Sequence, residues 1–409
     1  GLGSVTRTVD VNIGANTDVR LTLTPQVSEV MTVTAQTPLI DSRETSTGSS
    51  ITELEIEQLP TARDPWVMLQ LTPGVLVDRV NVGGNKSGQQ SYFVSKGVER
   101  HQTAWNIDGV NVTEMDETGT TTFYYDFGSF QEFQVTTATS DPSVRTPGAQ
   151  INMVTKRGSN DLTGSLRALW ADEELQARAT MPDTLREGNR VDNVTEMGAD
   201  IGGPLMRDRL WFYGAYSQNK IANITSSWLF PQRTELTNWT AKVNAQPVEN
   251  NSATLYYMFS DKTVNARDLG STRPPETARR QSGPGWTLKL EDTHVFTNNF
   301  VLTGMAARVD SGYKQEPRGG MDIEPYWIGS SGLGEARGWH GSYRLSEQML
   351  EQNNLRADGS LFFQTGAGSH EVKFGGGYRD QDTEWWVIWP GEQYWTEYYS
   401  WGSLVALTR

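Results

Sequence analysis

The chain lacks several features that would point to common classes of protein. It contains no cysteine, which excludes a disulfide framework, a thiolate metal site and a cysteine nucleophile. No apolar run approaches the roughly 18 residues of a transmembrane helix. Basic residues are in the minority, because 35 Lys and Arg face 49 Asp and Glu, for a formal net charge of -14 and a pI near 4.9. DNA and RNA, which need a basic surface, are therefore not expected partners.

Catalytic motifs are missing as well. The histidines are widely spaced and form neither an H-E-x-x-H motif nor an i, i+4 pair, so they predict no metal site; they are His101, His294, His340 and His370. The chain has no G-x-S-x-G elbow, P-loop or G-x-G-x-x-G fingerprint. Enzyme activity, a cofactor and a bound metal are accordingly not expected.

The first 160 residues divide into three parts. Residues 1–27 read as two short strands with a turn between them, and residues 28–49 are a polar, extended linker. Residues 50–160 mix helical and strand signals, which predicts a small α+β domain. Thr52 and Glu55 have the spacing of a capping box for a helix at 52–59, and Asp64 before Pro65 marks a second helix at 64–71. Strand signals follow at 75–80, 91–96, 103–107, 132–137 and 150–154.

From residue 161 to 409 apolar and polar side chains alternate with a period of two. Trp239, Ala241 and Val243, for example, alternate with Thr240 and Lys242. Short connections alternate with long ones, and aromatic residues gather near strand ends. An antiparallel transmembrane barrel has this pattern, and because only every second side chain meets lipid, it is compatible with a mean hydropathy of -0.53. A soluble sandwich or propeller also alternates, but its strands usually have about five or six residues, whereas these run to about ten.

Two stretches carry a resemblance to a known family. Residues 146–164 read TPGAQINMVTKRGSNDLTG, and residues 202–216 read GGPLMRDRLWFYGAY. In this order and spacing they resemble the TonB-dependent outer-membrane receptors, in particular the Oar-like branch. The resemblance implies a plug domain at 50–160, the N-terminal part of an outer-membrane barrel at 161–409, and the end of a carboxypeptidase-regulatory-like β-sandwich at 1–27. It places the protein in the outer membrane of a Gram-negative bacterium, in contact with lipid. A plugged transporter barrel needs about 22 strands, so we expect this chain to be a fragment.

Within the linker the resemblance implies a TonB box, a short segment that pairs by strand addition with a periplasmic TonB-type energy-coupling protein. The box consists of Glu29, Val30, Met31, Thr32, Val33, Thr34 and Ala35. This segment is β-prone and free of proline and glycine, so its backbone can pair with the edge of another chain's sheet. The alternative is that it forms the last strand of the preceding domain.

The resemblance further implies a receptor that binds a scarce nutrient outside the cell and admits it when the plug is remodelled. A small ligand is expected between apical plug loops and the long barrel loops. The plug residues expected to contact it are Arg79, Asn81, Asn85, Gln89, Phe123, Tyr124 and Tyr125. Aromatic faces with amide groups favour an oligosaccharide or a peptide over a ferric chelate.

Two other functions stay open at this point. One is a surface structural or adhesion protein that uses the plugged barrel as a platform, with little transport. The other is a secreted β-rich binding protein. One position also departs from the family pattern, because Lys96-Gly97 stands where the family usually has Arg-Gly. Lysine lacks the planar fork that pairs with a carboxylate through two hydrogen bonds.

Overall fold

The structure is a computed structural model. It describes residues 47–59, 61–114, 119–138, 146–177, 189–225, 230–329, 337–366, 368–392, 395–400 and 403–408. The chain divides into two compact units, Gly1–Thr45 and Ser46–Arg409. The expected sandwich remnant at 1–27 and the TonB box at 29–35 belong to the first unit and lie outside the described residues. Among the helices of the described part, none is long and apolar enough to cross a membrane.

The plug is a small α+β domain with two sheets. One sheet has the strand order β1-β7-β8-β5-β6 and the other the order β2-β3-β4. The elements are β1 (Thr47–Thr52), α1 (Glu53–Gln58), α2 (Pro65–Gln70), β2 (Val75–Val77), β3 (Phe93–Ser95), β4 (Val98–Glu99), η1 (Arg100–Gln102), β5 (Ala104–Ile107), β6 (Val110–Asn111), η2 (Phe127–Ser129), β7 (Phe130–Ala138) and β8 (Gln150–Thr155). Every helix and strand expected between 52 and 154 is present.

Local chemistry explains where the two plug helices begin. Thr52 and Glu55 form the expected capping box at the start of α1. Asp64 caps α2 by accepting a hydrogen bond from the backbone N–H of Trp66 at 2.8 Å, and Pro65 occupies the first helical position. These caps satisfy backbone donors that the first turn of a helix leaves unpaired. The apolar residues of α2 then pack with Trp105, Phe133 and Ile151 in one buried cluster.

The rest of the described chain is dominated by one 10-stranded antiparallel sheet. Its strand order is β20-β19-β16-β14-β13-β12-β11-β10-β9, with β15 between β13 and β16, so β9 and β20 stand at its edges. The strands are β9 (Thr163–Asp172), β10 (Arg190–Met206), β11 (Leu210–Ile224), β12 (Pro231–Val248), β13 (Asn251–Arg267), β14 (Arg279–Ser282), β15 (Gly285–Thr297), β16 (Phe300–Pro317), β19 (Leu345–Thr365) and β20 (Gly368–Ile388). This is the antiparallel barrel wall expected from the alternating pattern.

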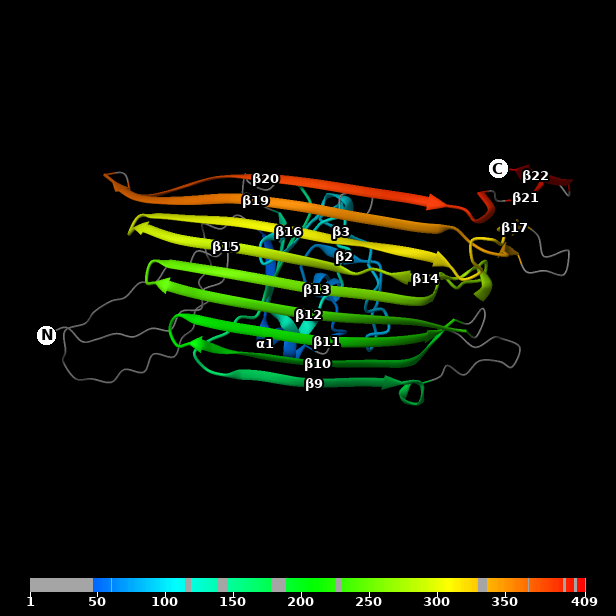
Figure 1. Ribbon diagram of the computed structural model, residues 1–409, viewed down its shortest axis with the longest axis horizontal. Helices are drawn as coiled ribbons and strands as arrows, with labels where there is room; N and C mark the ends of the chain where they lie inside the picture. The colour runs from blue at the N-terminus through cyan, green and yellow to red at the C-terminus, as the bar shows by residue number, and fades with distance from the viewer. Residues whose placement is uncertain are drawn as a thin grey trace. The chain divides into compact units, whose positions relative to one another are not determined.

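Short turns and long connections lie at opposite ends of this sheet (Figure 1). The short turns follow β10, β12, β15 and β19, while the long connections follow β9, β11, β13 and β16. The expected alternation of short and long connections is therefore confirmed. The long connections contain η3 (Glu173–Leu175), η4 (Pro275–Thr277), β17 (Tyr326–Ile328) and β18 (Gly338–His340), and η6 (Pro390–Glu392), β21 (Trp395–Ser400) and β22 (Ser403–Thr408) follow β20. At the long-connection end β17, β18, β21 and β22 form a separate sheet.

The two faces of the wall differ in burial. On β12, Trp239 is 53% exposed and Lys242 only 6%; on β13, Leu255 is 47% exposed and Tyr256 is fully buried. The exposed set is apolar, as expected of a lipid-facing surface. The buried set faces the plug, whose elements lie behind the strands in Figure 1.

The strands are longer than the expected length near ten. Several have 15 to 21 residues, whereas about 9 to 11 suffice to cross a bilayer. Strand β16 shows the reason, because its outward side is apolar from Phe300 to Ala306 and then charged. Arg308 on β16 pairs outward with Glu351 on β19 at 2.6 Å, and both side chains are exposed. Ion pairs of this kind suit water rather than lipid. The strands therefore continue past the apolar band toward the long connections.

Candidate functional site

The two sequence stretches that carry the family resemblance touch each other. Asn160, in the junction after the plug, accepts hydrogen bonds from the backbone N–H of Asp208 at 2.9 Å and from the indole of Trp211 at 2.8 Å. Gly158 lies so close to the first strands that a Cβ there would come within 2.2 Å of the Phe212 carbonyl oxygen. The junction is thus fastened to the turn between β10 and β11.

The plug is also held at a buried carboxylate, Asp108. Asp108 accepts hydrogen bonds from the backbone N–H of Thr155 at 3.0 Å and from its hydroxyl at 2.6 Å. Its carboxylate lies 3.0 Å from Nζ of Lys242 on β12, and its backbone carbonyl accepts a 2.5 Å bond from Lys289 on β15. Lys242 and Lys289 are directly opposite Tyr256 in the sheet register. We call Asp108, Lys242 and Lys289 the Asp108 anchor.

A second ion network joins the plug to β9 and β10. Arg167 on β9 pairs with Asp126 of the plug and with Glu196 on β10, the latter at 3.4 Å. Arg63, next to the N-cap of α2, reaches the same Glu196 at 2.8 Å. The side chains of this network are largely buried. Removing one member of such a network leaves a buried charge without its partner, which is costly.

The aromatic run Phe123, Tyr124 and Tyr125 requires a correction. The three residues are 1%, 8% and 6% exposed, so their rings are packed in the core and do not offer faces to a ligand. The backbone N–H of Tyr124 donates to Ser260 on β13 at 3.2 Å, and the Tyr124 ring lies 4.0 Å from Nζ of Lys262. Rings of this size gain most by leaving water, so in this structure they seal the plug against the wall.

The apical loop at 78–90 is braced from within. Asn81 accepts a hydrogen bond from the backbone N–H of Lys86 at 3.0 Å, and its amide donates to Ser87 at 3.1 Å. The side-chain carbonyl of Asn85 accepts from Val82 at 3.1 Å, and its backbone carbonyl accepts from Asn223 on β11 at 2.9 Å. These amides therefore shape the loop and tie it to the wall near the long-connection end of β11.

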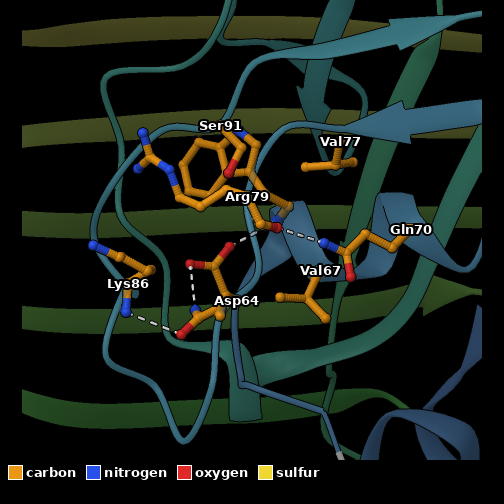
Figure 2. A pocket seen from close by; sticks show the side chains of 9 residues that line it. Asp64, Val67, Gln70, Val77, Arg79, Lys86 and Ser91 are labelled. Carbon is orange, nitrogen blue, oxygen red and sulfur yellow. Dashed lines mark hydrogen bonds between the residues drawn. The ribbon is translucent and has the colours of Figure 1, made fainter. Parts of the chain in front are cut away.

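Arg79 and Gln89, the other expected ligand contacts in this loop, are half-buried. Figure 2 shows Arg79 and Lys86 extending to the same side of Asp64, with Gln70 on the other side. The cavity between these residues measures about 10 Å³, which is room for at most one water molecule. A nutrient-sized ligand therefore does not fit inside this cavity, and contact with the loop has to come from its outer side.

Asp64 links this loop to α2 and to the wall. Its second carboxylate oxygen lies 3.4 Å from the Asn81 amide, and Arg79 and Lys262 are within electrostatic range. Burial raises the pKa of Asp64 from its ordinary value to about 7, against the opposing effects of the Trp66 N–H and these cations. Desolvation disfavours the charged form of a carboxyl group, so Asp64 titrates near neutral pH.

A group of buried and half-buried basic side chains lies where β13 passes into the loop before β14. Asp268 accepts a hydrogen bond from Nε of Arg279 at 2.8 Å and lies 3.4 Å from Arg273 and 3.7 Å from Arg267. Burial acts to raise the pKa of Asp268, but Arg279 and Arg267 hold it below its ordinary value, so this carboxylate stays ionised. Lys262 is within electrostatic range of Arg267 and Asp268. We call Lys262, Arg267, Asp268, Arg273 and Arg279 the mouth cluster.

Aromatic residues of the long connections surround part of the mouth cluster. The guanidinium of Arg273 lies 3.9 Å from the centre of the Tyr343 ring and donates to its hydroxyl at 2.6 Å. The ring centres of Trp339 and Trp389 lie 5.3 Å apart, and the Trp389 ring centre lies 5.4 Å from that of Tyr343. Stacking over an aromatic face holds a guanidinium in place without neutralising it.

The cationic residues of both clusters were not predicted as site residues from the sequence. The alternating pattern places Lys242 and Lys289 at polar positions, which signals an inward direction, but their partner Asp108 comes from a distant plug hairpin. Lys96, where the family usually has arginine, stands in the left-handed region at φ 47°, and its N–H bonds to the Gly74 carbonyl at 2.8 Å. In the described ranges no group of His, Asp or Glu side chains is arranged to hold a metal ion.

Comparison with known proteins gives consistent results. Residues 41–150 match the family model of the TonB-dependent receptor plug domain. The TonB-dependent transporter Oar of Myxococcus xanthus is 26% identical over 228 residues, which cover 51% of this chain and 20% of Oar.

Solved structures support the same fold. The outer-membrane transporter YddB from Escherichia coli matches with a TM-score of 0.64 and 13% identity over 86% of this chain and 50% of that one. The alcaligin outer-membrane receptor FauA from Bordetella pertussis matches with a TM-score of 0.59 and 15% identity over 85% and 49%. The chain thus spans about half the length of these structures.

A plug domain fastened inside an antiparallel wall with an apolar outer face defines an outer-membrane barrel receptor. Residues 41–150 carry the TonB-dependent receptor plug domain, and the similarity to Oar supports the Oar-like branch. The location of the protein is the outer membrane of a Gram-negative bacterium. The matched relatives are transporters and receptors rather than enzymes.

Proposed function

We propose that this protein takes up a scarce nutrient across the outer membrane with energy from a periplasmic TonB-type protein. The observation that carries the proposal is the way the plug is held. Besides apolar packing, its contacts with the wall include hydrogen bonds and ion pairs, such as Asp108 with Lys242 and Arg63 with Glu196. Water replaces such polar contacts when they break, so each hydrogen bond contributes only a modest net free energy and can break and reform.

Each end of the barrel wall has a role in this proposal. The short turns face the periplasm and the long connections face outward, as in outer-membrane barrels generally. The ligand, an oligosaccharide or a peptide, approaches the apical loop at 78–90 and its residues Arg79 and Gln89. Energy enters through the TonB box at 29–35 by strand addition to the coupling protein.

The proposal is tested by proline substitution in the box. Val33→Pro removes a backbone donor and fixes φ, whereas Val33→Ala keeps the donor and the extended conformation. We expect Val33→Pro to abolish energised uptake while leaving ligand binding and barrel assembly intact. Val33→Ala should cost much less, and proline at Thr37, beyond the box, should be tolerated.

The readout is accumulation of isotope-labelled peptide and oligosaccharide pools in cells with and without the receptor, measured by mass spectrometry. Uptake that depends on the receptor and is lost in Val33→Pro supports the proposal. Normal uptake by Val33→Pro would mean that the segment is merely the last strand of the preceding domain. Cell-surface binding of the pools without any uptake would favour the structural or adhesion function.

A further inference from the structure

We propose that the mouth cluster, together with Arg79 of the apical loop, binds the anionic groups of a small solute that carries several carboxylates or phosphates. This inference rests on the proposed function, because it names the chemical class of the ligand for the same external site. It narrows the nutrient from any oligosaccharide or peptide to one that bears multiple negative charges.

Basic side chains are in local excess at the mouth cluster. The protein as a whole has a formal net charge of -14, yet cations outnumber carboxylates at this place. The guanidinium groups are those of Arg79, Arg267, Arg273 and Arg279, and the carboxyl groups within electrostatic range of them are Asp64 and Asp268. Glu114 is within electrostatic range of Tyr124. Glu276 in the same loop is turned toward His340, 3.8 Å away. A local positive excess on an acidic protein attracts anions and repels cations.

The arginine donors of the mouth cluster are arranged around one point. Arg267, Arg273 and Arg279 converge on the single carboxylate of Asp268. Arginine presents planar pairs of donors that match carboxylate and phosphate oxygens. Among the described residues, Nη1 of Arg279 and Nε of Arg267 are buried without a hydrogen-bond acceptor. Buried donors are normally satisfied, so the cluster has more donors than the acceptors around it satisfy.

Part of the mouth cluster is accessible to solvent. The side chains of Arg267 and Arg273 are 26% and 24% exposed, so an anion from outside can reach them. Arg279 is nearly buried behind them. Lys86 of the apical loop is exposed and extends to the same side as Arg79 (Figure 2), which adds positive charge on the plug side. An anion held here would contact both the wall and the plug.

The binding also gives the plug a way to sense the ligand. Arg79 is within electrostatic range of Asp64, and Asp64 caps α2 and lies beside the Asn81 amide. An anion that draws Arg79 away would weaken its hold on Asp64. Because Asp64 adjoins Arg63 and the Arg63 bond to Glu196, the loop, the helix and one plug-to-wall contact are connected.

The test uses the purified receptor in detergent with citrate and inorganic phosphate as probes, and maltose as an uncharged comparison. Binding is followed by calorimetry and by tryptophan fluorescence. The double variant R267Q/R273Q removes two exposed donors, and R308Q/K373Q removes the same charge from exposed ion pairs elsewhere on the wall. We expect R267Q/R273Q to weaken citrate binding by about tenfold or more and R308Q/K373Q to leave it unchanged.

The outcomes distinguish a polycarboxylate from a phosphorylated solute, and failure of the anionic class from failure of the transport proposal. Citrate binding without phosphate binding identifies a polycarboxylate, and the reverse identifies a phosphorylated solute. Absence of binding by both anions, equal loss in the two double variants, or stronger binding of maltose would overturn the inference. If neither citrate nor phosphate binds while Val33→Pro still abolishes uptake of the labelled pools, the transport proposal stands and only the anionic class is wrong. Resistance of the plug to protease, measured for every variant, confirms that it remains folded.

Discussion

The inner face of the barrel wall carries cations at two levels, and the two levels are neutralised differently. At the level of Tyr256, Lys242 and Lys289 meet the carboxylate and the carbonyl of Asp108. Toward the long connections, Arg267, Arg273 and Arg279 share the one carboxylate of Asp268. Arg267 also donates to the uncharged Gln281 and Arg273 to the Tyr343 hydroxyl. Both levels lie on or beside neighbouring strands. A cation that faces inward can therefore either hold the plug or remain available to a ligand. Which of the two it does depends on whether the protein provides an acceptor for it.

The lower level is structural, because the plug provides acceptors for Lys242 and Lys289, in addition to Glu291 on β15. The upper level has acceptors for only part of its donors, and these donors lie toward the long connections. A buried charge that lacks a partner is unfavourable. We therefore expect such a group at a place where a ligand can supply the missing hydrogen-bond acceptor. The following predictions test this contrast.

The largest effect is expected from Asp108→Ala. It leaves the buried ammonium group of Lys242 without its carboxylate, whereas Lys289 keeps the backbone carbonyl of residue 108. Breaking a buried ion pair typically costs about 3 to 5 kcal/mol. We expect a lower melting temperature and faster proteolysis of the plug, with citrate binding retained by the molecules that remain folded. Asp322→Ala, at an exposed position, is the matched control. Equal melting temperatures for the two variants would show that Asp108 does not anchor the plug.

An intermediate effect concerns pH and Asp64. Its pKa of about 7 in the folded protein lies above the ordinary 3.8, so between these pH values the folded state holds a proton that the unfolded chain has released. The free energy of unfolding therefore falls as pH rises, by up to about 1.4 kcal/mol per pH unit, and levels off above pH 7. Melting temperatures from pH 4 to 8 measure the slope.

Asp64→Asn is expected to remove most of that slope, because asparagine does not titrate. The exposed Asp322→Asn serves as the control and should keep it. The same pH slope in Asp64→Asn as in the unaltered protein would assign the titration to another group.

The smallest effect is expected from Asp268→Asn, and its direction is informative. The substitution keeps the size of the side chain but removes the carboxylate that competes with an incoming anion. We expect citrate to bind about threefold more tightly, the scale of a partly screened ion pair. Calorimetry at low and high salt measures the change. Weaker binding would mean that Asp268 is needed to position the arginines rather than competing for them.

Much of the fold could be predicted from the sequence because its signals are local. The caps at Thr52 and Asp64 and the alternation around Trp239 each depend on residues close together in the chain. The site depends on distant contacts. Nothing near Asp108 in the sequence points to Lys242, and the burial of Tyr124 depends on the wall at Ser260. Aromatic residues in a polar loop suggest a ligand surface, but here their apolar area is used for packing.

Inner cations at the level of Tyr256 are expected to stabilise the plug, whereas those of the mouth cluster are proposed to bind a ligand. The direct measurement is the melting temperature of the unaltered protein, Lys289→Gln and Arg273→Gln, each with and without citrate, since a ligand that binds the folded state raises it. Lys289→Gln should melt lower but keep the rise with citrate. Arg273→Gln should melt close to the unaltered protein and lose most of the rise. These roles are contradicted if Lys289→Gln loses the citrate-induced rise in melting temperature, or if Arg273→Gln keeps it in full.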